Sequence, residues 1–375
     1  MNKLGKVVVA MSGGVDSSVA AALLLRQGYD VMGVFMRLGT PAGVQASDTD
    51  TCDPAGHRGC CSVRDADDAR QVAGLLDIPF YVANFQEDFG RVIDYFVAEY
   101  NAGRTPNPCV RCNDWLKFGK LTAYANAVGA DYVATGHYAR IGRDPATGQH
   151  ILMRGRDTRK DQSYVLFGIT PANLQHTLFP IGELDKPQVR AMAEEIKLPV
   201  FDKPDSQDIC FVPDGDYAAL VNRRSPGALR PGHFIDTQGK RLGEHPGHQH
   251  FTIGQRKGLG IALGARAYVV DINPATNDVT LGEKSDLLRP GFVAGEINIT
   301  HPGVQVDTDI TCQVKVRYNQ PPQPAVMRIS AGKMHVRFEE PIPAITPGQA
   351  AVAFSGDNLL CGGWIEHPTP NTPTT

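Results

Sequence analysis

A short segment near the start of the chain has the residue types of an anion-binding loop. The apolar run 7–10 is followed by Ser12–Ser17, which reads SGGVDS, and residues 19–26 have the composition of a helix that ends at Gly28. Glycines allow a sharp turn that brings backbone N–H groups close to an anion, and a helix N-terminus favours negative charge. The segment therefore predicts a phosphate-binding loop, without the lysine of a P-loop. The plainer alternative is a glycine-rich turn that binds nothing.

Two cysteines, Cys109 and Cys112, stand directly after the loop Thr105–Pro108. The two prolines of that loop favour an extended chain and place the thiols at the start of a helix. The positive end of a helix favours the thiolate, and we expect Arg111 and Lys117 to lower the thiol pKa further. This segment is therefore a candidate for nucleophilic sulfur chemistry.

Cys112 and Cys210 together have the chemistry needed for sulfur transfer, in which one thiol carries a persulfide and the other resolves it as a disulfide. The alternative is that each is a small buried hydrophobic residue, which is a frequent role of cysteine. That second role is the one we expect for Cys312 and Cys361, because both lie on predicted strands.

The remaining cysteines, Cys52, Cys60 and Cys61, lie with His57 in a polar, glycine-rich segment. Zinc binding is one interpretation, but adjacent cysteines in so short a span do not match a common ligand spacing. We therefore favour a loop without a metal.

The hydrophobic pattern of residues 1–140 predicts a scaffold for these groups. The expected strands are 6–10, 31–36, 79–84 and 131–135, and apolar helix stripes fall within 69–76 and 89–100. Alternating strands and helices predict an α/β fold with a parallel sheet covered on both faces, and ligands bind at the carboxyl ends of such strands. The phosphate loop and Gly136 are both expected at this edge.

Beyond residue 180 the pattern changes twice. Asp185 caps a predicted helix at 186–197, residues 205–285 are rich in Gly, Pro, His and basic residues, and from about 290 the apolar residues alternate with period two. We expect a small mixed central domain followed by a C-terminal antiparallel β-barrel. The predicted divisions are a catalytic domain at 1–205, a central domain at 206–288, a barrel at 289–367 and a disordered tail at 368–375.

Composition sets the broad class. The chain has 375 residues, 42% of them hydrophobic and 21% charged, with a net charge of −3. These values are typical of a soluble globular protein, and a nucleic-acid partner would need local basic patches. Since no apolar stretch is long enough to span a membrane and the first strand begins near Lys6, we expect a cytoplasmic protein without a targeting peptide.

Seven motifs occur in a fixed order along nearly the whole chain. They are Ser12–Ser17, Arg104–Pro108 with Cys112-Asn113, Ala134–Tyr138, Lys160–Tyr164, Ser206–Phe211, Phe251–Gly260 and Val316–Tyr318. Each motif is weak alone, but together they resemble the bacterial tRNA-specific 2-thiouridylases of the PP-loop ATP pyrophosphatase superfamily. The resemblance implies an α/β PP-loop domain, a central tRNA-binding domain and a C-terminal barrel.

The resemblance also implies a reaction. ATP would bind with Mg²⁺, the 2-carbonyl oxygen of the wobble uridine in a tRNA for Lys, Glu or Gln would attack the α-phosphorus, and pyrophosphate would leave. The implied nucleotide-binding residues are Ala10, Met11, Ser12, Gly13, Gly14, Val15, Asp16, Ser17, Met36 and Gly136. Of these, Asp16 would suit Mg²⁺.

Sulfur would come from a partner protein as a persulfide on Cys210. The terminal sulfur attacks the activated carbon, or is released as sulfide to do so, while Cys112 forms a disulfide with Cys210 and AMP leaves. The implied tRNA contacts are Asn107, Pro108, Cys109, His137, Lys160, Asp161, Gln162, Arg317, Tyr318 and Gln349, and basic pairs at 223–224, 240–241 and 256–257 would hold the tRNA backbone. The wobble base must be flipped out to reach such a site. We favour a monomer.

One residue departs from the family pattern. Many members have Asp where this chain has Cys109, so three thiols are available at Cys109, Cys112 and Cys210. Three thiolates could hold a [4Fe–4S] cluster with one open iron position, and we keep this route as an alternative to the persulfide route. Two other functions, an amidating ligase of the same loop class and a cysteine-based sensor, leave the thiol pair or the 251–260 motif without a role.

Overall fold

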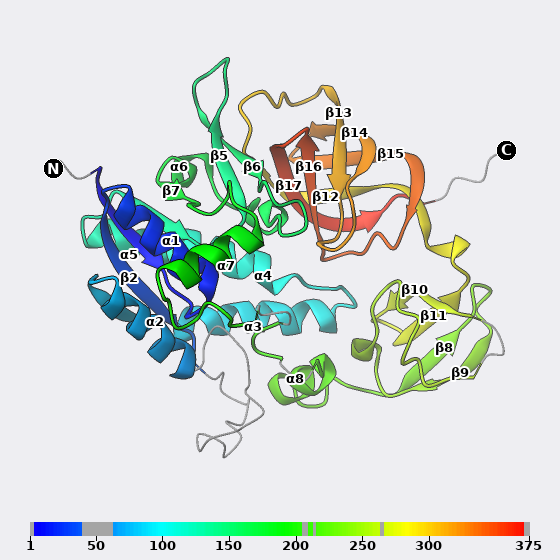
Figure 1. Cartoon of the computed structure of the whole chain (residues 1–375). Coiled ribbons are helices and arrows are strands. Elements are labelled where there is room, and N and C mark those ends of the chain that lie inside the picture. The colour runs from blue at the N-terminus through cyan, green and yellow to red at the C-terminus, as the bar shows by residue number, and fades with distance from the viewer. Residues whose placement is uncertain (1–3, 40–62, 205–208, 213–214, 263–265, 371–375) are drawn as a thin grey trace.

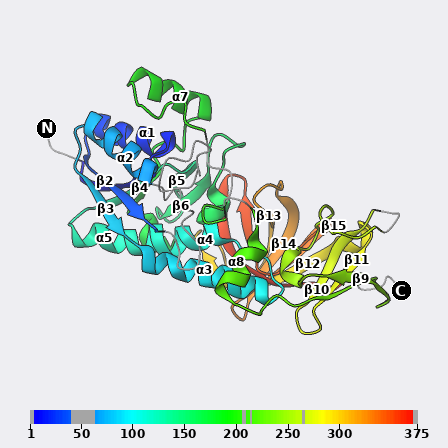
Figure 2. The same cartoon turned by 90° about the horizontal axis from the view of Figure 1, so that it is seen from below.

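The computed structural model describes residues 4–39, 63–204, 209–212, 215–262 and 266–370. Figure 1 shows three parts: a sheet with helices on both sides at the left, a barrel at the upper right, and a small sheet at the lower right. The second view shows the same order from the helix-covered sheet through the barrel to the small sheet (Figure 2). Cys52, His57, Cys60, Cys61 and the tail 371–375 lie outside the described residues.

The first sheet has five parallel strands in the order β3-β2-β1-β4-β7. Their bounds are β1 Lys6–Ala10, β2 Asp30–Arg37, β3 Phe80–Asn84, β4 Tyr132–Thr135 and β7 Thr177–Leu178. The four predicted strands are confirmed. The edge strand β7 was missed because two residues are too few to give a hydrophobic pattern.

Alternate residues of β1 face opposite helix layers, so the run is buried on both sides. Val7 and Val9 pack with α1 Val15–Arg26, α2 Val63–Leu75 and α7 Lys186–Glu195, whereas Val8 and Ala10 pack with α3 Gln86–Asn101, α5 Leu121–Ala127 and α8 Tyr217–Arg224. The predicted start of α7 is confirmed, since Asp185 forms a capping box with Gln188.

One long helical segment, residues 108–127, carries two of the candidate thiols. It consists of α4 Pro108–Arg111, the π-helix η1 Cys112–Lys120 and α5. The Asn107 side chain accepts a hydrogen bond from the N–H of Val110 at 3.4 Å and so caps the first turn. The predicted helix start after the two prolines is therefore confirmed, but the π-helical widening was not predicted.

The central part contains a four-stranded mixed sheet in the order β10-β11-β8-β9. The strands are β8 Gly232–Ile235, β9 Arg241–His245, β10 Tyr268–Asn273 and β11 Asp278–Gly282, with the short helix η3 His248–His250 between β9 and β10. Its small core contains Phe234, Phe251 and Val279. A hydrogen bond of 3.1 Å from Gln249 Nε2 to Asn101 Oδ1 ties this part to the end of α3.

The C-terminal part is a closed antiparallel barrel, as predicted. Its strands are β12 Leu288–Ile299, β13 Asp309–Lys315, β14 Gln323–Ser330, β15 Lys333–Pro343, β16 Ala350–Ser355 and β17 Asn358–Pro368, preceded by η4 Ser285–Leu287. The pairing of β12 with β17 closes it. Cys312 and Cys361 are buried in its core, as expected, and burial raises their pKa to about 11 and about 12.

A hairpin from the first half of the chain extends the barrel sheet. Its strands are β5 Ala139–Arg143 and β6 His150–Arg154, and β6 pairs with β17 at Met153 and Asn358. The helices η2 Ser163–Leu166 and α6 Pro171–Leu174 follow it and lead to β7. The barrel is thus joined by backbone hydrogen bonds to the chain that leaves β4.

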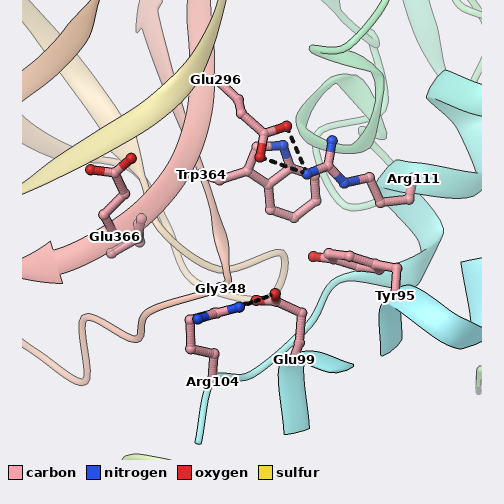
Figure 3. Close-up of a pocket in the computed structure, with 9 residues that line it drawn as sticks. Tyr95, Glu99, Arg104, Arg111, Glu296, Gly348, Trp364 and Glu366 are labelled. Carbon is pink, nitrogen blue, oxygen red and sulfur yellow. Dashed lines mark hydrogen bonds and ion pairs between the residues drawn. The ribbon is translucent and has the colours of Figure 1, made fainter. Parts of the chain in front are cut away.

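A buried arginine holds the thiol-bearing helix against the barrel. The guanidinium of Arg111 lies 4.1 Å from the ring centroid of Trp364, and at about 5 Å from those of Tyr95 and Trp115. It also forms an ion pair of 2.8 Å with Glu296, beside a pocket of about 220 Å³ (Figure 3). Because Trp364 and Glu296 belong to β17 and β12, this one side chain contacts both barrel strands.

We predict that the ring stack, rather than the ion pair, carries most of the stabilisation by Arg111. The side chain of Glu296 is 66% exposed, so Glu296→Gln should lower the free energy of unfolding by less than about 1 kcal/mol. Arg111→Ala removes buried packing against three rings and should cost about 2–4 kcal/mol. Denaturant unfolding measures both, with Arg328→Ala as the control because its pair with Asp309 is exposed. Equal losses for Arg111→Ala and Glu296→Gln would contradict the prediction.

Candidate active site

The loop between β1 and α1 has a geometry that only glycine permits. Gly13 has φ +71°, and a Cβ there would lie 2.2 Å from the carbonyl oxygen of Asp65. Ser17 Oγ accepts from Ser12 N–H at 3.2 Å, and the Ser18 hydroxyl donates to Gly14 O at 2.8 Å. The predicted strand–loop–helix arrangement is confirmed, while phosphate binding by the loop stays a prediction.

The end of β4 packs directly on the first turn of α1. A Cβ at Gly136 would lie 2.5 Å from Ser17 N and 2.6 Å from the carbonyl carbon of Asp16. Met11 and Met36 lie at the same carboxyl edge, just after β1 and near the end of β2. The structure therefore brings the predicted nucleotide-binding residues of three strands together, although the side chains of Ala10 and Met11 are buried.

Two lysines from distant segments hold this loop. Lys186 Nζ donates to both carboxylate oxygens of Asp16, at 2.8 and 2.9 Å, and the Tyr138 hydroxyl donates to Asp16 Oδ1 at 2.8 Å. Lys203 Nζ donates to Gly13 O at 3.0 Å and to Asp65 Oδ1 at 2.7 Å. No motif pointed to either lysine, because each contact joins residues more than 130 positions apart whose proximity only the fold creates.

His137 is buried and neutral. Burial, and then the nearby Lys117 cation, lower its pKa well below the ordinary histidine value. Its Nε2 lies 3.4 Å from Lys117 Nζ, and its Nδ1 lies 2.7 Å from Thr135 Oγ1. Since an ammonium group can only donate, Nε2 accepts from Lys117 and the ring proton on Nδ1 is donated to Thr135. His137 thus links the thiol-bearing helix to the end of β4.

Two of the three candidate thiols lie on the same side of the sheet. Cys112 and Cys210 are half-buried and pack against the same core layer, which lies between β1 and α3. Cys109 is exposed. Arg111 does not serve them as expected, because its guanidinium is directed to Trp364 and Glu296 instead (Figure 3). Among the described residues, no three His, Cys, Asp or Glu side chains are gathered to hold a metal ion.

Two predicted tRNA-contacting residues, Asp161 and Tyr318, lie in the same region as Cys109. The pKa of Tyr318 is raised by burial and by the nearby Asp161 and Cys109, which places these three together. Lys315 Nζ lies 5.3 Å from the Tyr318 ring centroid and was missed by the sequence interpretation. Lys160, which adjoins Asp161, is half-buried.

Other predicted contact residues support the backbone around this cluster. Gln349 Nε2 donates at 3.0 Å to the carbonyl oxygens of Thr105 and Pro106, and Gln162 Oε1 accepts from Tyr138 N–H at 2.9 Å. Arg317 Nη2 donates to Ile253 O at 2.8 Å, which joins the barrel to the central part. The tRNA contacts of all these residues stay predictions. No described helix has both the length and the apolar composition that a membrane span requires.

Comparisons with known proteins agree with this three-part architecture. Family models described as "tRNA methyl transferase HUP domain", "tRNA methyl transferase PRC-barrel domain" and "Aminomethyltransferase beta-barrel domain" match residues 5–214, 221–283 and 289–365. The parallel sheet with its strand–loop–helix edge is the HUP part, and the mixed sheet and barrel are the other two. Fold and site thus define a tRNA-modifying protein built on a PP-loop nucleotide domain.

Curated relatives identify the family within that class. A tRNA-specific 2-thiouridylase MnmA from Carboxydothermus hydrogenoformans is 50% identical over 363 residues, covering 96% of this chain and 97% of the relative. Proteins of the same name from Rhodopirellula baltica and Clostridioides difficile are each 46% identical, covering 97% and 98% of this chain and 97% and 99% of their own. The chain belongs to the family of tRNA-specific 2-thiouridylases. The words "methyl transferase" in two family descriptions carry less weight than these near full-length relatives.

We predict that Gly136→Ala abolishes tight ATP binding. The added Cβ would overlap the backbone of Ser17 and Asp16, so the first turn of α1 would have to move. A displaced cradle should weaken ATP at least about tenfold by isothermal titration calorimetry, with little change in global fold by circular dichroism. Gly90→Ala is the matched control, because a Cβ in that helix meets no atom within 4 Å. Unchanged ATP affinity in Gly136→Ala would contradict this placement of the nucleotide.

Proposed function

We propose that this chain catalyses the ATP-dependent 2-thiolation of the wobble uridine in tRNAs for Lys, Glu and Gln. The observation that carries the proposal is that one helical segment, 108–127, joins the thiols to the nucleotide loop. Cys109 and Cys112 stand at its beginning, and Lys117 contacts His137 beside the first turn of α1. Activation by ATP and attack by sulfur could therefore act on the same base.

The first step activates the base. ATP lies against the loop 12–17, Met36 and Gly136, and uridine O2 attacks the α-phosphorus as pyrophosphate leaves. Backbone N–H groups and the N-terminus of α1 are suited to stabilise the charge on the phosphates. Activation is needed because an amide-like oxygen is a poor leaving group, whereas AMP is a good one.

The second step transfers sulfur. A donor protein loads Cys210 with a persulfide, whose terminal sulfur attacks C2 of the adenylated uridine and displaces AMP. The Cys112 thiolate then attacks Sγ of Cys210, which breaks the persulfide S–S bond, leaves sulfur on C2 and forms a Cys112–Cys210 disulfide. A thiol reductant restores the two thiols for the next cycle. Both cysteines pack against the same core layer, which supports this pairing.

The tRNA would contact the cluster around Cys109, where Tyr318 is 38% exposed and could stack on a flipped base. Exposed basic residues on the central part, at 240–241 and 256–257, are suited to hold the tRNA backbone. We propose that the enzyme works as a cytoplasmic monomer apart from its sulfur donor.

The proposal bears on two inorganic groups, Mg²⁺ and an iron–sulfur cluster. Mg²⁺ is proposed to accompany ATP, and Asp16, whose two oxygens already accept from Lys186, would share its charge between that ammonium and the ion. No step above depends on the ion. A [4Fe–4S] cluster on Cys109, Cys112 and Cys210 is not favoured, since these described thiols are not gathered as a metal site.

We predict that iron-free enzyme forms 2-thiouridine from an unmodified glutamate tRNA transcript, ATP, Mg²⁺ and a sulfide or persulfide source. Cys112→Ala and Cys210→Ala should lose the product because each removes one half of the exchange pair. Cys109→Ala should keep measurable activity. Mass spectrometry of the tRNA nucleosides reports the product, and iron is determined on the same anaerobic samples.

The control variant is Cys312→Val, which removes a buried barrel thiol with little change in volume and should leave the product unaffected. Activity that tracks iron and is lost with any of the three candidate thiols would replace the persulfide route by the cluster route. Absence of thiouridine from the wild-type enzyme under both conditions would overturn the proposed function.

A further inference from the structure

Two lysines contact the nucleotide loop, and a third, Lys117, lies next to His137 at the end of β4 and differs from them in its partner. The ammonium groups of Lys186 and Lys203 are paired with carboxylates, at 2.8 Å from Asp16 and 2.7 Å from Asp65. Lys117 instead contacts the neutral ring of His137, and within the described part of the chain it has no carboxylate partner. Its positive charge is therefore available to a ligand.

The position of Lys117 is fixed by its contact with His137. Its Nζ lies 3.4 Å from Nε2 of His137, which is itself buried and bonded to Thr135. Gly136, the residue before His137, packs on the backbone of Ser17, and a Cβ added to Gly136 would lie 2.5 Å from Ser17 N. The ammonium group thus lies next to His137, whose neighbour in the sequence packs on the first turn of α1.

The π-helical segment η1 explains how one helix can present both Cys112 and Lys117 to the proposed site. In η1 the backbone bonds run from residue i to i+5, as in the bond from Leu121 N–H to Leu116 O. This widening moves residues five apart toward a common side, and such segments are frequent at functional sites. Lys117 is five residues after Cys112, so the widening turns this cation and the candidate thiol toward the same region.

We propose that Lys117 is a catalytic residue that binds the α-phosphate of ATP during adenylation of the base. This assignment rests on the proposed function. In that step the bond from uridine O2 to the α-phosphorus forms, the bond from that phosphorus to the β-phosphate oxygen breaks, pyrophosphate leaves with the electron pair, and the uracil N3 proton passes to water. Charge accumulates on the non-bridging α-phosphate oxygens, and Lys117 Nζ donates to one of them.

The partner of Lys117 suits this role. A carboxylate would neutralise the ammonium group, as it does for Lys186. The neutral imidazole of His137 instead accepts one hydrogen bond, which orients the ammonium group of Lys117 without neutralising its charge. The phosphate loop has no lysine of its own after its glycines. Lys117 supplies from a neighbouring helix the cation that a P-loop lysine supplies within the loop.

The test compares Lys117→Gln and Lys117→Arg with wild type in adenylation alone. Enzyme, ATP and unmodified glutamate tRNA transcript are mixed without any sulfur source, and pyrophosphate release is followed in a single turnover. Loss of one preorganised charge-stabilising donor should slow release about a hundredfold in Lys117→Gln, with the KM for ATP and the affinity for tRNA little changed. Lys117→Arg should recover part of the rate because it keeps the charge.

Lys120→Gln is the matched control, since it lies on the same helix and its ammonium pairs with Asp88 on α3 at 2.9 Å. Normal pyrophosphate release by Lys117→Gln, whether or not thiouridine forms afterwards, would overturn the assignment. Lys117→Gln could also lose pyrophosphate release together with tRNA binding, or together with a drop in unfolding temperature. Either result would overturn the assignment, because the role of Lys117 would then be structural. Wild-type enzyme that releases no pyrophosphate would instead refute the proposed function itself.

Discussion

The stack of Arg111 on its aromatic neighbours is the interaction on which the arrangement of the site depends. It fixes one end of the helical segment 108–127 to strands β12 and β17 of the barrel, while the contact of Lys117 with His137 fixes the middle to the end of β4. A helix held at two points cannot rotate independently of either part. The positions of Cys109 and Cys112 relative to the nucleotide loop therefore follow from packing rather than from contacts of the thiols themselves.

The electrostatics of the site depend on which lysines are paired with carboxylates. Lys186 and Lys203 pair with Asp16, Asp65 and the carbonyl of Gly13, and so stabilise one conformation of the loop. A carboxylate exposed beside bound ATP would repel the phosphates, and the pairing of Asp16 with Lys186 removes that repulsion. The loop is then left with its N–H groups, its hydroxyls and the start of α1 as the features that attract an anion.

Much of the fold could be predicted because local signals agree with the tertiary structure. The run 7–10 is apolar on both faces and becomes the central strand, and Asp185 with Pro187 marks the start of α7 as capping rules require. The alternation around Cys312 and Val336 likewise becomes barrel strands. In each case a few neighbouring residues contain the whole signal.

What could not be predicted depends on pairs that are far apart in the sequence. The hairpin of β5 and β6 joins a strand from the other end of the chain through Met153 and Asn358, and no local pattern indicates this pairing. The direction of Arg111 is set by Trp364 and Glu296, which no local pattern around Cys112 reveals. The π-helical turn was hidden too, because the apolar spacing of residues 108–127 fits an ordinary helix as well.

The two lysines that hold the loop come from distant parts of the chain, so the loop is not complete as a local structure. A P-loop carries its lysine directly after its last glycine, so its anion site is nearly complete as a local structure. Here the lysine that holds Asp16 lies 170 residues away and the one that holds Gly13 lies 190 residues away. The conformation of the nucleotide loop is therefore complete only after α7 and the segment that follows it have docked.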